Sequence, residues 1–332
     1  MDINGCNCLI VAGEKSGEEH CLSFYNELQL LCPNVHFWGV GGDDLKEAGM
    51  EIIYHLNEFS SWGFSGVISK IPFYLKALNE IEAAVIERGC KTAILIDFQG
   101  FNLKLAKKLN CLGVNVLYYV APQAWAWKSG RTKIIANCVH TLFTILPFEK
   151  KWFQDRGVHQ VKGVVHPLLY HYGADIEDIP LPRWSNSDTN LKLLLLPGSR
   201  NFEVEHLLPL YLQAYKKLEK VLNKKIELSV VCSPSVQKSL YQPLSTISKV
   251  HYYQSGQLSD ALKTNQLAWA ASGTVTLACA LFQIPTIITY KTSGLNSFIY
   301  KTFIKYDGPV GLANIVHPKR VFDELLQENC TV

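Results

Sequence analysis

The sequence predicts an α/β fold made of two doubly wound domains, each a parallel sheet with helices on both faces. Short apolar runs alternate with longer segments of helical period along the chain, which is typical of a parallel sheet with covering helices. A length of 332 residues exceeds the ~250–300 residues at which a single core stops growing. We therefore expect a domain over 1–172, a linker over 173–190 and a domain over 191–332, with the two domains facing each other across a cleft.

The composition and charge of the chain exclude several classes of protein. The chain is 48% hydrophobic and 18% charged, which is too apolar for a disordered protein. Its net charge of +3 does not indicate a nucleic-acid partner, and no apolar run approaches the ~18–20 residues of a membrane span. The start of the chain lacks the pattern of a secretory signal. The ten cysteines show no C-x-x-C spacing, so we expect buried thiols in an intracellular protein and no metal site.

Apolar runs mark the expected strands, and segments of helical period mark the expected helices. In the first half we expect strands at 8–12, 37–40, 92–97, 115–120 and 141–146. The helices of that half are expected at 17–31, 74–88, 101–110 and 147–156. The stretch 173–190 carries two prolines, several acids and no apolar period, which predicts the linker. In the second half we expect strands at 191–196, 226–231, 267–271 and 285–289, and helices at 202–220 and 274–282.

The first strand ends in a loop suited to a ligand, because ligands of such sheets sit beyond the carboxyl ends of the strands. Gly13 and Gly17 permit a tight turn and close ligand approach, and Ser16 can cap the next helix. The loop is neither G-x-G-x-x-G nor a P-loop, so a dinucleotide site is disfavoured. A plain strand-to-helix turn is the alternative.

Two loops of the second half predict a phosphate site. Gly198, Ser199 and Arg200 come directly before a predicted helix, where backbone amides and a guanidinium favour a phosphate group. The second loop consists of Ser272, Gly273 and Thr274. Its hydroxyls can cap the following helix, and its glycine lets an oxygen-rich group approach the amides. Together the loops predict a pyrophosphate held between helix termini, with an exposed arginine at an ordinary turn as the alternative.

Asp97, at the end of strand 92–97, is a candidate general base, because an acid at the carboxyl end of a buried strand can face a substrate. Capping the helix that begins near residue 101 is an equally good role from position alone. Trp125 and Trp127 lie near another strand end, where they can belong to the core or pack against a ligand.

The stretch 62–78 carries an apolar stripe of helical period, with Pro72 at a first-turn position. On pattern alone, a core helix is the simpler interpretation. Three or four side chains sunk into lipid, at ~1.5–3 kcal/mol each, would nevertheless suffice for reversible membrane docking. The residues expected at such a membrane contact are Trp62, Phe64, Val67, Ile68, Ile71, Phe73 and Leu75.

Several segments, taken together and in order, carry a resemblance to a known family. Those in the first half are AGEKSGE (12–18), GVGGDDLKEAGME (39–51), IDFQGFNL (96–103), YYVAPQAWAWK (118–128) and LPFEKKWF (146–153). Those in the second half are LLPGSRNFEVEHLLP (195–209), SGTVTLA (272–278) and ANIVHPKRVFDELLQENC (313–330). Over nearly its whole length the chain resembles the lipid-A-disaccharide synthase family of bacterial glycosyltransferases.

The resemblance implies a GT-B fold and transfer of 2,3-diacylglucosamine from UDP to 2,3-diacylglucosamine 1-phosphate, with inversion and without metal or cofactor. The products would be a β-1,6-linked disaccharide 1-phosphate and UDP. Asp97 matches the family's essential acid, and Arg200 with the helix start at 272–274 would stabilise the departing diphosphate. Asn314 matches an asparagine near the nucleotide sugar. The residues expected on the acceptor side are Gly13, Glu14, Ser16, Gly17 and Asn102.

The resemblance also implies a peripheral protein on the cytoplasmic face of the inner membrane, which makes 62–78 an expected lipid-contact surface. The expected partners are UDP-diacylglucosamine, diacylglucosamine 1-phosphate and lipids of that membrane, without nucleic acid. Homodimeric assembly is left open.

Some positions depart from the family pattern. Ala278 stands where such enzymes place a glutamate against the ribose hydroxyls, and losing that contact would cost ~1.5–3 kcal/mol, or roughly 10–100-fold in UDP affinity. A second glutamate is lost within 62–67, and Val165 and Cys21 replace glycines. The family continues with further helices after the position of Val332, so these helices are expected to be absent.

Two other functions stay open on these grounds. Ala278 motivates a divergent GT-B enzyme that uses another sugar nucleotide. A non-catalytic relative that binds lipid or nucleotide is the second. A nicotinamide dehydrogenase is disfavoured, because neither half carries G-x-G-x-x-G after its first strand.

Overall fold

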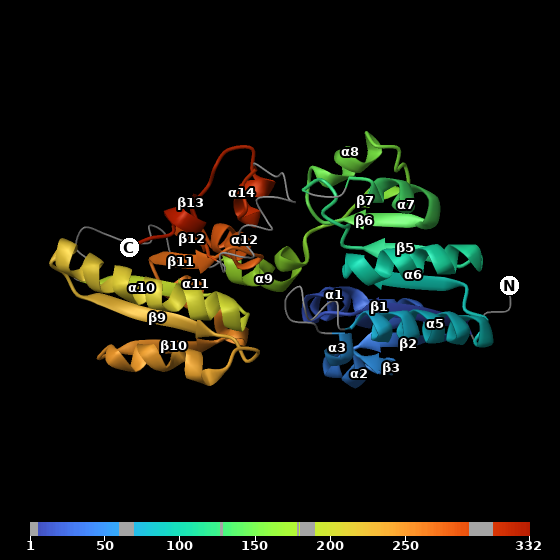
Figure 1. Cartoon of the computed structure of the whole chain (residues 1–332), viewed down its shortest axis with the longest axis horizontal. Coiled ribbons are helices and arrows are strands. Elements are labelled where there is room, and N and C mark those ends of the chain that lie inside the picture. The colour runs from blue at the N-terminus through green and yellow to red at the C-terminus, as the bar shows by residue number, and fades with distance from the viewer. Residues whose placement is uncertain (1–5, 60–69, 127–128, 178, 180–189, 292–307) are drawn as a thin grey trace. The chain divides into compact units, whose positions relative to one another are not determined.

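The chain forms two compact units, Met1–His171 and Tyr172–Val332. The structure is a computed structural model that describes residues 6–59, 70–126, 129–177, 179, 190–291 and 308–332. Each unit contains one sheet in which all paired strands run parallel, with seven strands in the first unit and six in the second (Figure 1). The prediction of two doubly wound parallel sheets is confirmed.

The first sheet has the strand order β3-β2-β1-β4-β5-β6-β7. Its strands are β1 (Cys6–Ala12), β2 (Val35–Gly41), β3 (Glu51–His55), β4 (Thr92–Ile96), β5 (Asn115–Tyr119), β6 (Thr141–Thr144) and β7 (Val161–Gly163). The helices of this unit are α1 (Lys15–Leu31), α2 (Asp43–Glu47), α3 (Leu56–Phe59), α5 (Ile71–Glu87), α6 (Gln99–Cys111), α7 (Arg131–Cys138) and α8 (Glu149–Gln154). Helix α9 (Pro167–Glu177) begins in the first unit and ends in the second.

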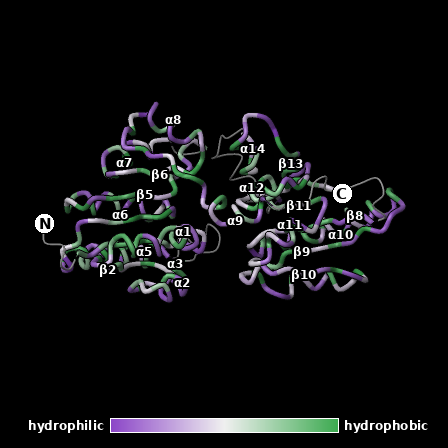
Figure 2. Tube along the Cα trace, turned by 180° about the vertical axis from the view of Figure 1, so that it is seen from behind, coloured by the Kyte–Doolittle hydropathy of each residue, from purple (hydrophilic) through white to green (hydrophobic). Residues whose placement is uncertain are grey.

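Successive residues of β1 point to opposite faces of this sheet, and a different set of helices covers each face. Leu9 and Val11 belong to a core shared with α5 and α6, whereas Cys8 and Ile10 belong to a second core shared with α1 and α2. In Figure 2 the hydrophobic stretches accordingly gather inside each unit. Burial on both faces explains why the interior strands form continuous apolar runs in the sequence.

The second sheet has the strand order β10-β9-β8-β11-β12-β13. Its strands are β8 (Leu191–Leu196), β9 (Ile226–Cys232), β10 (Val250–Gln254), β11 (Leu267–Ala271), β12 (Thr286–Tyr290) and β13 (Asp323–Leu326). The α-helices are α10 (Asn201–Leu222), α11 (Leu258–Thr264), α12 (Val275–Leu281) and α14 (Leu312–Val316). Short 3₁₀ segments cover Lys238–Thr246, Ser255–Gln257 and Gln327–Asn329.

The first residues of the expected linker 173–190 are helical, because residues 173–177 belong to α9. The sequence signal that favours a helix here is Pro167, which occupies the first position of α9. The later part of the helix is held by side-chain contacts: the Tyr172 ring packs 5.4 Å from that of Phe282, and Lys263 pairs with Asp175 at 2.7 Å. Most of the remaining linker lies outside the described residues.

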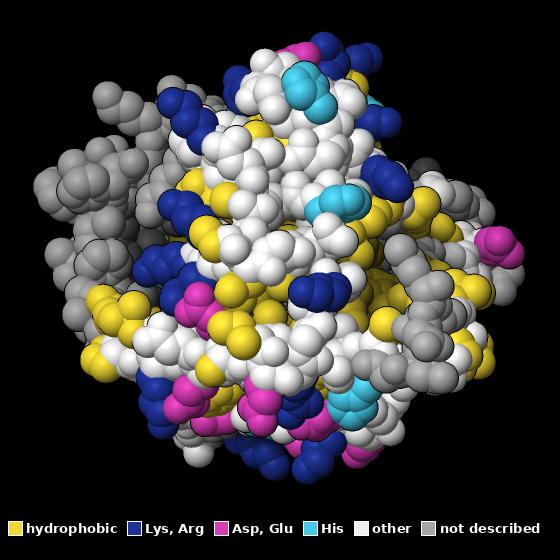
Figure 3. All heavy atoms as spheres, turned by 90° about the vertical axis from the view of Figure 1, so that its right-hand side faces the viewer, with side chains coloured by type: hydrophobic (Ala, Val, Ile, Leu, Met, Phe, Trp, Pro, Cys, Tyr) yellow, Lys and Arg dark blue, Asp and Glu magenta, His cyan; other side chains and the backbone are white. Residues whose placement is uncertain are grey.

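The length and hydrophobicity of the helices, and the side chains on one face, concern contact with a membrane. Within the described part of the chain, no helix combines the length and hydrophobicity needed to cross a bilayer. On the face drawn in Figure 3, Lys and Arg side chains lie among acidic, histidine and apolar side chains. The structure thus identifies no membrane-spanning element in the residues that it describes.

Gly39 provides a test of the first sheet. It has a φ of +143° at a register shift between β2 and β3, and a Cβ there would lie 2.1 Å from the Ile10 carbonyl oxygen. We expect Gly39→Ala to lower the free energy of unfolding by about 3 kcal/mol or more, measured by urea denaturation. Gly100→Ala is the control, because a Cβ at this exposed position of α6 meets no atom within 4 Å. It should be neutral or slightly stabilising, and equal stability of both variants would contradict the packing described here.

Candidate active site

The first candidate site lies at the carboxyl edge of the first sheet, between β1 and β4. These strands are neighbours, with Ala12 paired to Ile96. From β1 the chain continues to β2 and β3 on one side, whereas β5, β6 and β7 follow β4 on the other. This reversal is the topological switch point, where doubly wound sheets bind ligands. The loops that carry the predicted acceptor residues and Asp97 both begin there.

The loop after β1 and the turn after β4 lie against each other. A Cβ on Gly13 would lie 2.6 Å from the Phe98 ring, and one on Gly17 would lie 3.6 Å from the carbonyl oxygen of Ile96. The missing side chain at Gly13 is therefore what allows the first loop to approach the turn that carries Asp97.

The predicted capping role of Ser16 is wrong. Helix α1 begins at Lys15 with Glu14 as its N-cap, so Ser16 lies inside the first turn, where it is exposed. The buried carboxylate of Glu18 fixes this region instead: it accepts two backbone N–H groups at the start of α2 and pairs with Lys15 at 2.8 Å. Lys15 also contacts Asp44 at 2.5 Å, so two carboxylates already neutralise this cation.

Asp97 adopts a strained backbone conformation beside a polar anchor. Asp97 and Phe98 have φ values of +44° and +43°, a conformation that costs on the order of 1–3 kcal/mol per residue and is common at functional sites. The hydroxyl of Tyr118 donates to the Asp97 carbonyl oxygen at 2.6 Å, which holds the turn. Burial, together with the negative charge of nearby Glu14, raises the pKa of the Asp97 carboxyl to about 6.

The alternative role for Asp97, capping the next helix, does not fit. The N-cap of α6 is Phe98, and it makes no side-chain capping hydrogen bond. The Asp97 side chain is instead partly buried at the switch point, with a backbone hydrogen bond from Phe98. A carboxyl group with a raised pKa in such a position is a candidate for proton transfer.

Asn102 holds the turn from beneath, which differs from the predicted contact with the acceptor. Its side chain is wholly buried. The amide nitrogen donates to the carbonyl oxygens of Ile96 and Asp97 at 3.1 and 3.0 Å, and reaches that of Val11 at 3.5 Å. Asn102 therefore ties β1 and β4 together at the switch point and acts on Asp97 through the backbone.

Trp125 packs inside the first unit, which answers one of the two roles left open for it. Its indole N–H donates to the buried Glu149 carboxylate at 3.0 Å, and its ring lies 5.2 Å from that of Phe148. Glu149 also accepts the backbone N–H of Leu146 at 3.2 Å, and its burial raises the pKa of this carboxyl to about 7. Trp127 lies outside the described residues.

The second candidate site lies at the corresponding edge of the second sheet. Strands β8 and β11 are neighbours, with Leu196 paired to Ala270. The chain proceeds from β8 to β9 and β10 on one side, and from β11 to β12 and β13 on the other. The switch point of this sheet therefore lies between β8 and β11. The two loops predicted to bind phosphate both start there.

The loop after β8 is organised by Glu203. This buried carboxylate accepts the backbone N–H groups of Ser199 and Arg200 at 2.9 and 3.2 Å, and it pairs with the Arg200 guanidinium at 3.2 Å. Those two amides belong to the loop predicted to bind phosphate, and in this structure they bond to Glu203. The guanidinium of Arg200 is 61% exposed and can still reach a ligand.

The loop after β11 is more open. A Cβ on Gly273 would meet no described atom within 4 Å, so a ligand can approach the backbone there. Ser272 and Thr274 do not cap the next helix as predicted: the Ser272 hydroxyl donates to the Val310 carbonyl oxygen at 3.0 Å, and Thr274 makes no side-chain capping hydrogen bond. The Ser272 bond joins this loop to the segment before α14.

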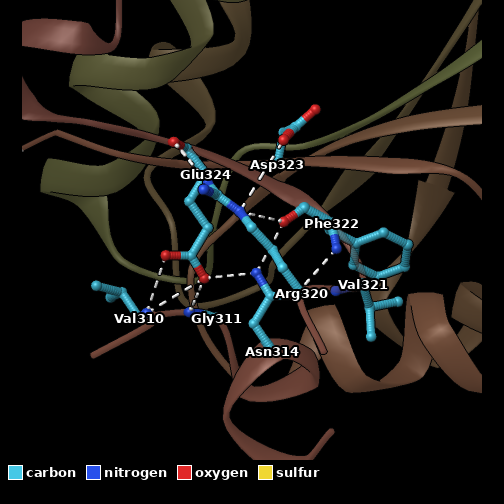
Figure 4. Close-up of polar contacts among 8 residues, drawn as sticks. All are labelled: Val310, Gly311, Asn314, Arg320, Val321, Phe322, Asp323 and Glu324. Atoms are coloured by element: carbon cyan, nitrogen blue, oxygen red, sulfur yellow. Dashed lines mark hydrogen bonds and ion pairs between the residues drawn. The ribbon is translucent and has the colours of Figure 1, made fainter. Parts of the chain in front are cut away.

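Asn314 is enclosed by backbone groups, as Figure 4 shows. Its carbonyl oxygen accepts the N–H groups of Val321 and Phe322 at 2.8 and 2.9 Å. Its amide nitrogen donates to the Phe322 carbonyl oxygen and to the Glu324 carboxylate, both at 2.8 Å. These four bonds use every donor and acceptor of the amide. Asn314 therefore stabilises this fold, and its contact with the nucleotide sugar stays a prediction.

Glutamates are the site residues that the sequence analysis missed. Besides Asn314, the Glu324 carboxylate accepts the backbone N–H groups of Val310 and Gly311 at 3.0 and 2.9 Å (Figure 4). Glu149 and Glu203 each accept a backbone N–H from three residues earlier. Glu203 is the third residue of α10 and bonds the N–H of the N-cap Arg200, which is half of a capping box, so its spacing was a sequence signal.

Replacing Asn314 separates a structural role from a ligand contact. We expect Asn314→Ala to lower the free energy of unfolding by about 2–3 kcal/mol without ligand, because it removes four hydrogen bonds from a buried amide and leaves their partly buried partners unpaired. Urea denaturation measures this loss. Arg320→Ala is the control, since this side chain is 58% exposed and its loss should cost less than about 1 kcal/mol. Unchanged stability with weaker UDP binding would instead support a direct contact.

Solved structures share the fold of this chain. The chain matches UDP-GlcNAc 2-epimerase from Methanocaldococcus jannaschii in complex with UDP-GlcNAc and UDP, with a TM-score of 0.56 and 13% identity, covering 93% of this chain and 96% of that one. It matches the enzyme from Neisseria meningitidis bound to UDP-GlcNAc with a TM-score of 0.53 and 11% identity over the same shares. At these identities the likeness concerns the fold, and it supports the GT-B class.

Sequence comparisons identify the family. A profile of the lipid-A-disaccharide synthetase family matches residues 8–332. Lipid-A-disaccharide synthase of Myxococcus xanthus is 32% identical over 332 residues, covering 97% of this chain and 84% of the relative. Lipid-A-disaccharide synthase 1 of Legionella pneumophila is 31% identical, covering 98% and 85%. The profile match and these relatives confirm the resemblance: the chain belongs to the lipid-A-disaccharide synthetase family.

Proposed function

We propose that this glycosyltransferase transfers 2,3-diacylglucosamine from UDP to 2,3-diacylglucosamine 1-phosphate, which yields a β-1,6-linked disaccharide 1-phosphate and UDP. The family provides the reaction. The structural observation that supports it is the position of the predicted substrate loops at the switch points of both sheets. The acceptor would bind at the first switch point and the UDP-sugar at the second.

Asp97 is the proposed base. The C6 hydroxyl of the acceptor must lose its proton as its oxygen bonds to C1 of the donor sugar, and the Asp97 carboxylate would take that proton. The bond between C1 and the UDP oxygen breaks in the same step, so UDP leaves with the electron pair and the configuration at C1 inverts. A carboxyl with a pKa of about 6 is a stronger base than an ordinary aspartate and is still roughly 90% ionised at pH 7.

Arg200 and the 272–274 loop are the proposed partners of the diphosphate. The guanidinium can donate to phosphate oxygens in a bidentate manner, and the open backbone at Gly273 can contribute N–H groups. Both would stabilise the negative charge that develops on UDP. Ser199 and Gly198 would shape the loop that presents Arg200.

The acceptor sugar would lie along the loop after β1. Gly13 and Gly17 allow close approach, and Glu14 and Ser16 are exposed beside the Asp97 turn. Asn102 would contribute by holding Asp97 rather than by touching the acceptor.

The start of α5 is the proposed membrane contact, which would hold the protein at the cytoplasmic face of the inner membrane. Ile71 and Leu75 are 46% and 52% exposed and lie one turn apart on one side of the helix. Phe73 differs from the prediction, because its ring packs 5.2 Å from that of Phe59. The other predicted contact residues, Trp62, Phe64, Val67 and Ile68, lie outside the described residues. A homodimer stays a prediction.

Ala278 favours one alternative, a transferase with a different sugar nucleotide. It is fully buried in α12, where the resemblance leads us to expect a glutamate for the ribose. Calorimetry that compares UDP with other nucleoside diphosphates decides between the two, because tighter binding of another nucleotide would favour the alternative.

The main test is UDP release from the two diacylated sugars. We expect Asp97→Asn to lower kcat by about 10²–10⁴-fold, and Arg200→Ala to weaken the binding of UDP more than the binding of the acceptor.

The pH dependence of the wild type is a second test. Because the base acts when ionised, kcat/KM of the wild type should rise between pH 5 and pH 7 with a midpoint near the Asp97 pKa of about 6. Asp155→Asn, at an exposed surface pair, should change neither rate nor profile. Wild-type protein that binds UDP without releasing it from the donor would be a non-catalytic relative.

Vesicle binding tests the membrane contact. The double variant Ile71→Glu, Leu75→Glu should bind anionic phospholipid vesicles at least about tenfold more weakly than wild type, since each apolar side chain sunk into lipid contributes ~1.5–3 kcal/mol. Ile86→Glu is the control, because Ile86 is 61% exposed near the other end of the same helix. An equal loss in the control variant would mean that the start of α5 has no special role.

A further inference from the structure

Arg200 stands where local chemistry disfavours an arginine. It is the N-cap of α10, a position that prefers side chains able to accept a backbone N–H. A guanidinium has no acceptor, so the N–H of Glu203 bonds to the Arg200 carbonyl oxygen instead, at 3.1 Å. A cation at a helix N-terminus also opposes the helix dipole. Residues that break two local rules are expected mainly at functional sites.

Glu203 compensates for both conflicts with one carboxylate. One oxygen accepts the backbone N–H groups of Ser199 and Arg200 at 2.9 and 3.2 Å. The other accepts from Nη1 of Arg200 at 3.2 Å. The carboxylate is buried, with a side-chain exposure of 7%, and its negative charge faces the positive end of the helix.

The loop is built around this carboxylate. Gly198 has a φ of +114°, and a Cβ there would lie 2.3 Å from Oε2 of Glu203. Glycine at this position therefore makes room for the carboxylate as well as for the turn. Because Nη1 of Arg200 donates to Glu203, this hydrogen bond orients the exposed part of the guanidinium toward a ligand.

We infer that Glu203 is a positioning residue for donor binding: it holds the Arg200 guanidinium in the orientation that receives the UDP diphosphate, and it occupies the loop amides so that phosphate binds the side chain. The inference rests on the proposed function. A purely electrostatic effect of Glu203 would have the opposite sign, because a negative charge near a diphosphate weakens its binding. The two effects are therefore distinguishable by experiment.

Glu203→Gln is the informative variant. It keeps the size and one carbonyl acceptor for the loop amides, but its NH₂ group cannot accept from Nη1 of Arg200. Freeing the arginine means that UDP binding must order it anew, so we expect UDP affinity to fall about three- to tenfold by calorimetry. KM for the donor should rise correspondingly, while KM for the acceptor stays within about twofold.

A double-mutant cycle with Arg200→Ala decides whether Glu203 acts through Arg200. In the Arg200→Ala background, Glu203→Gln should change UDP affinity by less than about twofold, because no guanidinium is left to position. Glu205→Gln is the matched control, since it removes the same charge from an exposed site two residues along α10 and should leave UDP affinity unchanged. Thermal melting of each variant without ligand monitors folding.

Specific outcomes would overturn the inference. Unchanged or tighter UDP binding by Glu203→Gln, or an equal loss in the Arg200→Ala background, would show that Glu203 does not position the arginine. If Glu203→Gln lowers the melting temperature, the comparison within the Arg200→Ala background still separates a folding defect, which persists there, from a positioning effect, which does not. Failure of the wild type to bind UDP would instead overturn the proposed function, and the inference with it.

Discussion

Pairing of backbone N–H and carbonyl groups at the carboxyl edges of the sheets is the constraint on which both candidate sites depend. Each loop that leaves a parallel strand and enters a helix brings N–H groups that no strand partner can satisfy. Carboxylates accept such N–H groups repeatedly. Glu18 bonds to the start of α2, and Glu149, Glu203 and Glu324 bond to N–H groups that precede α8, α10 and α14. In each of these loops a carboxyl group accepts backbone N–H groups, which helps to hold the loop in one shape.

This constraint separates the groups that hold the site from those that can meet a ligand. Asn102 and Asn314 are buried and hydrogen-bonded to backbone, so they fix the geometry of their loops. Asp97 and Arg200 are the charged side chains that these loops present. Strain at Asp97 and an unfavourable N-cap at Arg200 are local costs, and the surrounding hydrogen bonds offset them.

The topology adds a reason for where these groups lie. Each sheet changes direction once, between its first strand and the strand that begins its second half. Loops diverge at that point and leave room for a substrate. One fold principle used twice thus places a carboxyl group at the switch point of one unit and an arginine at that of the other, the two charged groups that the proposed transfer would use.

The sequence by itself determined the interior strands, the loops after β1, β4, β8 and β11, and the family. Strands buried on both faces must be apolar throughout, so they are visible without a structure. The strands it did not reveal are the four sheet edges, β3, β7, β10 and β13, whose residues are mostly partly or fully exposed. Only the tertiary structure decided which carboxylates and amides turn inward to pair with backbone, because such pairing depends on groups distant in sequence, as between Glu18 and Gly42.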